Sequence, residues 1–137
     1  SYLEKEQTPW TPAVSIVFAL SVSLDMMLKE GLANVISRHA RVAKMTRQGI
    51  KALGLTFFAQ ESHASNTVTS IAASNGLDTK KLLKILREEH QIVLGGGQQK
   101  LSGKIFRIGH LGWVTEEDIE RVLEALAVVL PQAGFKE

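Results

Sequence analysis

The sequence predicts an α+β fold: a small sheet of about four strands with helices packed on one face, preceded by a long N-terminal helix. Two observations carry this prediction. Apolar residues repeat at helical spacing in several long segments, and several short segments are rich in β-branched and aromatic residues. Their order along the chain is two helices, two strands, one helix, two strands and a final helix.

The composition indicates a globular protein. A length of 137 residues suits one domain, and 45% of the residues are hydrophobic. No apolar run approaches the ~18 residues that a membrane helix needs, so we expect no membrane partner. The chain has no cysteine, which suits the reducing cytoplasm, and its net charge of +2 does not favour nucleic acid as a partner. It begins with Ser1 in place of methionine, which favours a piece of a longer protein.

Residues 1–12 read as an extended arm, because Pro9 and Pro12 disfavour a helical conformation of the residue before each of them. We assign residues 13–137 to a small C-terminal domain. Its first helix is expected to end at Gly31. This helix is apolar almost all round, with a narrow polar stripe at Ser21, Asp25 and Lys29. We therefore expect a partner subunit or a further domain to cover it.

The next segment, residues 32–53, has the apolar period of an amphipathic helix that ends at Gly54. Its other face is basic, with Arg38, Arg41, Lys44, Arg47 and Lys51. A basic face can bind nucleic acid, but no aromatic residues interleave with this one. We interpret it as a solvated face or an interdomain ion-pair surface.

Residues 55–59 and 66–73 are predicted to be strands. The helix that follows them has Asp78 as its N-cap, with Leu77 and Leu82 placed as a hydrophobic staple. The last helix has Thr115 as its N-cap and Asp118 completing a capping box, and Pro131 is expected to end it.

Between these two helices we predict strands at 91–94 and 104–108, joined by a glycine-rich stretch at 95–103. Three consecutive glycines could cradle a phosphate with their backbone amides. However, the stretch lacks the Gly-Lys-Ser/Thr ending of a P-loop and does not lead into a helix. A hairpin-like connection is the better interpretation.

Arg107 is the main candidate for a binding residue. It lies in an apolar strand between Phe106 and Ile108, and strand alternation places it on the same face as Ile105. A guanidinium in such a place needs an anionic partner, and its planar fork suits a carboxylate. That carboxylate belongs either to this chain, as a structural salt bridge, or to a substrate, and the residues alone leave the two about even.

Two weaker candidates remain. The hydroxyls of Thr8 and Thr11 lie on a stiff arm that could bind a phosphate, but the spacing alone favours Thr11 as the cap of the following helix, with Pro12 at its first position. The four histidines show no close pairing and have no cysteine to assist them, so we expect no metal site.

Three segments of the chain resemble the C-terminal part of class V aminotransferases, closest to the alanine–glyoxylate and serine–pyruvate group. They are QTPWTPAVSIVFALSVSLDMM, GLANVISRHARVAKMTRQGIKALGL and GGGQQKLSGKIFRIGHLGWVTEEDIERVLEAL, with FRIGHLG as the most specific part. Some bacterial members of this group carry the label of a soluble hydrogenase small subunit.

The resemblance implies the small domain of a fold-type-I enzyme that uses pyridoxal 5'-phosphate (PLP) and works as a homodimer. Arg107 would bind the α-carboxylate of a small amino acid, of the alanine or serine type, or of a 2-oxo acid such as glyoxylate or pyruvate. Thr11 and Thr8 would contact the PLP phosphate of the partner subunit.

The resemblance also implies what this chain lacks. The lysine that binds PLP covalently lies upstream in the family, in a large domain that is absent here. We therefore expect no catalytic residue in this chain, no bound PLP and no activity of this part alone. The competing interpretation is a stand-alone regulatory module that binds an amino acid.

Overall fold

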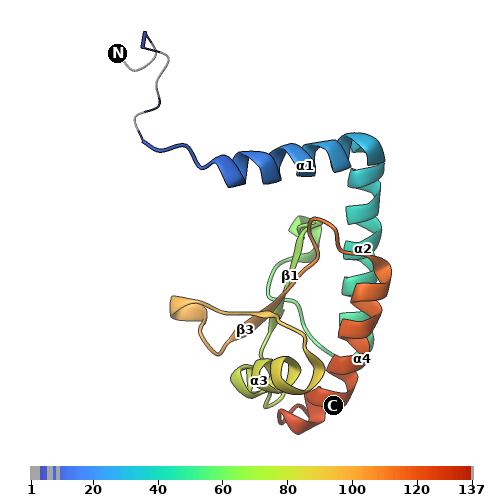
Figure 1. Ribbon diagram of the computed structural model, residues 1–137. Coiled ribbons are helices and arrows are strands. Elements are labelled where there is room, and N and C mark those ends of the chain that lie inside the picture. The colour runs from blue at the N-terminus through green and yellow to red at the C-terminus, as the bar shows by residue number, and fades with distance from the viewer. Residues whose placement is uncertain (1–3, 6–7, 9, 137) are drawn as a thin grey trace. The chain divides into compact units, whose positions relative to one another are not determined.

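The computed structural model describes residues 4, 5, 8 and 10–136 and divides the chain into two compact units, Ser1–Ile36 and Ser37–Glu137. Four helices and a small antiparallel sheet confirm the predicted α+β class (Figure 1). Among the described residues, no helix is long and apolar enough to cross a membrane. The expected boundary between residues 12 and 13 stays a prediction.

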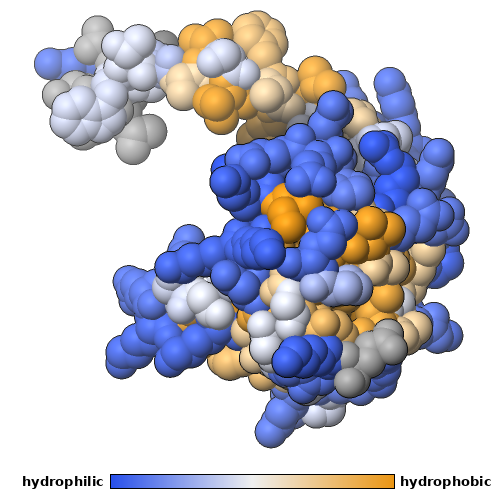
Figure 2. Space-filling view, turned by 90° about the horizontal axis from the view of Figure 1, so that it is seen from below, coloured by the Kyte–Doolittle hydropathy of each residue, from blue (hydrophilic) through white to orange (hydrophobic). Residues whose placement is uncertain are grey.

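The N-terminal unit is built around helix α1 (Val14–Glu30). Gly31 ends this helix with φ 85° and donates its N–H to Met27 O, as predicted. The prediction that Thr11 caps the helix is wrong, because Ala13 is the N-cap and no side chain bonds there. No residue of α1 is buried, and Phe18 is 69% exposed. Figure 2 shows this apolar surface in orange.

The second unit contains a sheet of three antiparallel strands, in the order β1 (Val68–Ala72), β3 (Ile105–Gly109), β2 (Gly95–Gly96). Residues 55–59 do not form the predicted fourth strand. They come close to it, since the Phe58 N–H donates to Ser70 O and the Ala72 N–H donates to Thr56 O, each at 2.9 Å. The sheet therefore continues for one bridge beyond β1.

The predicted strand at 91–94 is wrong. Gln91 adopts a left-handed conformation with φ 58° and closes helix α3 (Thr79–His90). After that turn, Ile92 and Leu94 pack against the core as part of a loop, and pairing with β3 begins only at Gly95. The glycine-rich stretch thus supplies β2 itself, and its remainder leads to β3 through a short 3₁₀ helix at Gln99–Leu101. A second 3₁₀ helix lies at Glu61–His63.

Helices α2 (Leu32–Ala52), α3 and α4 (Glu116–Gln132) contribute to one hydrophobic core with the sheet. The sheet contributes Ile71, Phe106 and Ile108, each at most 1% exposed. We call the sheet face that carries these three side chains the covered face. The three helices contribute the following residues to the same core: Val42, Ile50, Leu82, Leu86, Ile119, Leu126, Val129 and Leu130.

The predicted N-caps of the later helices are confirmed. The Asp78 carboxylate accepts from the backbone N–H groups of Lys80 and Lys81, and Thr115 and Asp118 form the capping box. The prediction that Pro131 ends the last helix is wrong, since α4 includes it. The Ala133 N–H still donates to Val129 O and Leu130 O, which holds the last turn closed behind the proline.

Candidate functional site

Arg107 lies on the central strand, on the sheet face opposite the covered face. Its neighbours in sequence, Phe106 and Ile108, point into the core, while the Arg107 side chain is only half-buried. The alternation predicted from the sequence therefore holds through β3. The register places Ser70 of β1 and Gly95 of β2 directly beside Arg107. We call the face that carries Ser70, Arg107 and Gly95 the arginine face.

The backbone hydrogen bonds determine how close these neighbours are. Ser70 O accepts from the Phe58 N–H, so the backbone of Ser70 points away from β3. Ser70 and Arg107 are therefore a non-hydrogen-bonded antiparallel pair, the kind whose side chains lie closer together. The Gly97 N–H donates to Ile105 O at 3.0 Å, so the backbone groups of Ile105 point toward β2. Because these groups alternate sides along a strand, those of Arg107, two residues later, point toward β2 as well.

The guanidinium of Arg107 leans over β2. Its Nη2 donates to Gly96 O at 2.8 Å, while its Nε is inaccessible to solvent and has no hydrogen-bond partner. A Cβ at Gly95 would lie 3.5 Å from Nε and Nη2, so the guanidinium rests directly above the glycine. Within the described part of the chain, no carboxylate forms an ion pair with Arg107. The internal salt bridge that the sequence left open is not found there.

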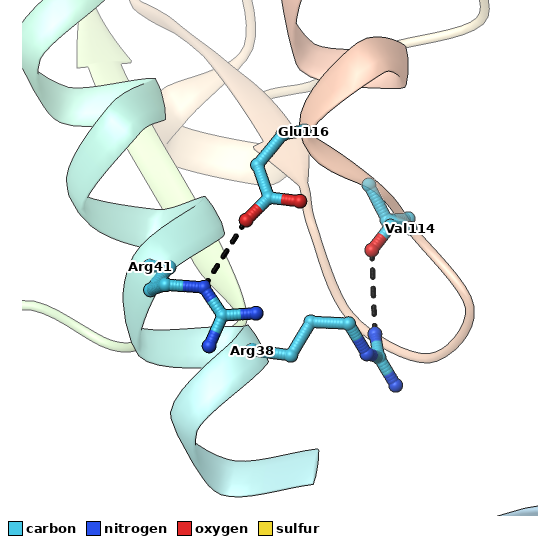
Figure 3. Close-up of polar contacts among 4 residues, drawn as sticks. All are labelled: Arg38, Arg41, Val114 and Glu116. Carbon is cyan, nitrogen blue, oxygen red and sulfur yellow. Dashed lines mark hydrogen bonds and ion pairs between the residues drawn. The ribbon is translucent and has the colours of Figure 1, made fainter. Parts of the chain in front are cut away.

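The loop that follows β3 is held by helix α2. Arg38 Nη1 donates to Gly112 O at 2.8 Å and to Val114 O at 3.3 Å, and the Gly112 N–H donates to His39 Nε2 at 3.1 Å. Figure 3 shows Arg38 extending from α2 toward this loop. The contacts fix the chain between the end of β3 and the start of α4, directly after the arginine site.

Other basic residues of α2 also bind groups of the same unit, and Figure 3 shows one of these contacts, between Arg41 and Glu116. These contacts join Arg41 Nε to Glu116 Oε1 at 3.2 Å, Arg47 Nη1 to Ser65 O at 3.1 Å, and Lys51 Nζ to Glu61 Oε2 at 2.8 Å. The basic face predicted from the sequence is thus largely an ion-pairing and hydrogen-bonding face within this unit.

His110 is a buried polar residue at the end of β3. Its Nδ1 lies 3.2 Å from Asn66 O and its Nε2 lies 2.9 Å from Thr69 Oγ1. Because a carbonyl can only accept, Nδ1 carries the proton and Nε2 accepts from the Thr69 hydroxyl. Burial lowers the pKa of His110, and the charges of Arg47 and His39 lower it further, against the hydrogen bond to Asn66 O. The neutral imidazole therefore ties the start of β1 to the end of β3.

The sequence prediction considered His110 only as a metal ligand and missed this role. Among the described residues, no group of three histidine or acidic side chains could hold a metal ion. A histidine directly after an apolar strand was the available signal, because such a position is commonly buried.

Thr8 and Thr11 are exposed and lie in the N-terminal unit, whereas Arg107 lies in the other. Thr8 Oγ1 donates to Trp10 O at 2.6 Å. The Thr11 hydroxyl does not cap α1 and makes no hydrogen bond to the described residues. Of the two hydroxyls, Thr11 thus has its donor proton uncommitted.

The sequence of the chain is similar to those of known aminotransferases. No protein-family model matches the chain. An uncharacterised aminotransferase of Methanocaldococcus jannaschii is 44% identical over 98% of this chain and 35% of its own length. A serine–glyoxylate aminotransferase of Arabidopsis thaliana is 37% identical over 93% of this chain and 32% of its own length. Two further relatives are named as soluble hydrogenase subunits.

The fold comparison agrees. The crystal structure of pyridoxamine–pyruvate aminotransferase from Mesorhizobium loti matches 94% of this chain and 33% of its own, with a TM-score of 0.88 and 37% identity. An alanine–glyoxylate aminotransferase from Nostoc sp. is also among the similar structures. The chain is therefore similar in sequence and fold to part of these aminotransferases, and it spans about a third of their length.

Proposed function

We propose that this chain is the part of a PLP-dependent aminotransferase that binds the substrate carboxylate, and that it does not catalyse the reaction alone. The observation that carries the proposal is the state of Arg107. Its guanidinium lies on the arginine face with one hydrogen bond, a buried Nε without a partner, and no ion pair to the described residues.

Such an arrangement is costly for folding alone. A buried donor without a partner costs about 1–3 kcal/mol, and more when the group is charged. A carboxylate supplies two acceptor oxygens that match the parallel N–H groups of a guanidinium. A substrate carboxylate that turned the guanidinium off Gly95 would give Nε an acceptor, and it would fix the orientation of the substrate at the same time.

PLP is the cofactor that the homologues imply. When bound, it supplies the electron sink for breaking a bond at the substrate α-carbon. Thr11 would bind its phosphate, because its hydroxyl has no competing hydrogen bond within the described residues. Thr8 fits less well, since its proton is already given to Trp10 O. In this scheme Arg107 positions the substrate and the arm contributes to holding the cofactor.

The names of the relatives support the substrate class. Three of them are named for serine with glyoxylate, alanine with glyoxylate, and pyridoxamine with pyruvate. We propose a small amino acid as donor and a short 2-oxo acid as acceptor. We further propose that the complete enzyme is a cytoplasmic homodimer. The exposed apolar surface of α1 supports burial against further protein in the whole molecule.

The test is made in the complete enzyme with L-serine as donor. Arg107→Ala should raise the KM for L-serine about 10- to 100-fold, the equivalent of one or two charge-assisted hydrogen bonds. Arg107→Lys should recover only part of the loss, because an ammonium cannot form the two parallel hydrogen bonds. Arg87→Ala, on the exposed side of α3, is the matched control and should leave the KM unchanged. A wild-type KM in both Arg107 variants would remove this residue from the site.

A further inference from the structure

We propose that Ser70 is a second substrate-binding residue, whose hydroxyl donates a hydrogen bond to the same carboxylate that Arg107 binds. This inference rests on the proposed function and extends it by one named contact. It derives from the pairing of β1 with β3, which places Ser70 beside Arg107 on the arginine face.

The pairing sets the spacing between the Cβ atoms of Ser70 and Arg107. Ser70 and Arg107 form a non-hydrogen-bonded pair, because Ser70 O bonds to the Phe58 N–H on the far side of β1. In such pairs the Cβ atoms are about 4.5–5.5 Å apart and both side chains leave the same face of the sheet. With the guanidinium turned toward β1, one carboxylate can bridge it and the Ser70 hydroxyl.

The hydroxyl of Ser70 is available for a ligand. It makes no hydrogen bond to the described residues, and the side chain is only half-buried. The hydroxyl of the preceding residue, Thr69, is not available to a ligand, because Thr69 Oγ1 is buried and hydrogen-bonded to His110. Of these two neighbouring hydroxyls, the one on the arginine face is therefore the one open to a ligand.

The guanidinium lies on the β2 side of Arg107, away from Ser70, so a shared carboxylate needs it to turn toward β1. Arg107 leans toward β2, where its Nη2 is held by Gly96 O and where Gly95 presents no side chain. The side toward β1 carries the Ser70 hydroxyl instead. We place the carboxylate between Ser70 and the guanidinium, so that one oxygen accepts from Arg107 alone and the other accepts from both residues.

The experiment compares four variants of the complete enzyme: Ser70→Ala, Ser70→Thr, Arg107→Ala and the double variant Ser70→Ala with Arg107→Ala. Two quantities are measured, the KM for L-serine and the inhibition constant of propionate, a carboxylate without an amino group. Ser102→Ala removes a hydroxyl from an exposed turn away from the sheet face and serves as the control. Thermal unfolding of each variant checks whether the fold is unchanged.

Ser70→Ala should raise both constants about 5- to 20-fold with kcat changed less than about 2-fold, the loss expected for one hydrogen bond to a charged group. Ser70→Thr should stay close to wild type because it keeps the hydroxyl. In the Arg107→Ala background, Ser70→Ala should add less than about 3-fold, since the carboxylate is no longer held beside it.

The two proposals fail differently. If Ser70→Ala leaves both constants at wild type while Arg107→Ala raises them, Ser70 is not a ligand and the proposed function stands. If Ser70→Thr is as impaired as Ser70→Ala, the effect is steric and the role of the hydroxyl is likewise overturned. If Arg107→Ala itself has no effect on either constant, the proposed function falls.

Discussion

The two faces of one small sheet differ in what their side chains do. On the covered face, Ile71, Phe106 and Ile108 pack beneath the helices and are essentially inaccessible to solvent. On the arginine face, Arg107 stands between two small residues, Ser70 and Gly95. Consecutive residues of β3 therefore serve folding and, in our proposal, binding. Alternation along a strand lets a short segment do both, because each face can change without moving the other.

The largest test of this difference is a pair of substitutions at neighbouring positions. Phe106→Ala should lower the free energy of unfolding by about 3–5 kcal/mol, through lost burial and the cavity left behind. Arg107→Met keeps the aliphatic stem and removes the unpartnered Nε, so it should change stability by less than about 1 kcal/mol. Urea unfolding of the 137-residue chain measures both. Equal losses at the two positions would show that both faces contribute alike to the core.

His110 joins the two strands from the covered side, and its titration gives a second test. Its pKa is lowered from 6.5 by burial, so the unfolded chain binds the proton more readily than the folded chain. The contribution of this histidine is therefore present above pH 6.5 and is lost as the pH falls through the lower folded value. Stability should fall between pH 7.5 and 5.5.

His110→Gln should lower stability at pH 7.5 by about 1–3 kcal/mol, because the hydrogen bonds to Thr69 and Asn66 are lost or weakened. It should also reduce the fall between pH 7.5 and 5.5. Urea unfolding at both pH values for the two proteins measures the difference. His63→Gln, in an exposed 3₁₀ helix, is the control and should keep the wild-type pH dependence. A variant of His110 with an undiminished fall would assign the pH dependence to other groups.

Much of the covered face was predictable from the sequence. The helical period located the helices, and the residues at Asp78 and Thr115 predicted their N-caps because capping is a local property. Strand alternation predicted the side of β3 on which Arg107 lies. The prediction of Arg107 as a candidate needed no neighbours, since a charged residue in an apolar strand is informative by itself.

The arginine face was less accessible to prediction. The strand predicted at 91–94 forms at Gly95–Gly96, where the residues have little intrinsic preference for a strand and the pairing with β3 decides. Ser70 has no distinguishing feature in the sequence, because its position beside Arg107 depends on the register between two strands far apart in the chain. His110 is similar, as its partners Asn66 and Thr69 come from the other end of that pairing.

The smallest test concerns the cap of α4, a helix that covers the sheet. Thr115 Oγ1 accepts from the Asp118 N–H, and the Asp118 carboxylate accepts from the Thr115 N–H. Thr115→Ala should cost about 1 kcal/mol of stability, the usual contribution of an N-cap. Glu120→Gln, exposed on the same helix, is the control and should change stability by less than about 0.5 kcal/mol. If the arginine face is independent of this cap, Thr115→Ala should leave the KM for L-serine of the complete enzyme unchanged. A raised KM would instead show that the start of α4 helps to position Arg107 through the loop that Arg38 holds.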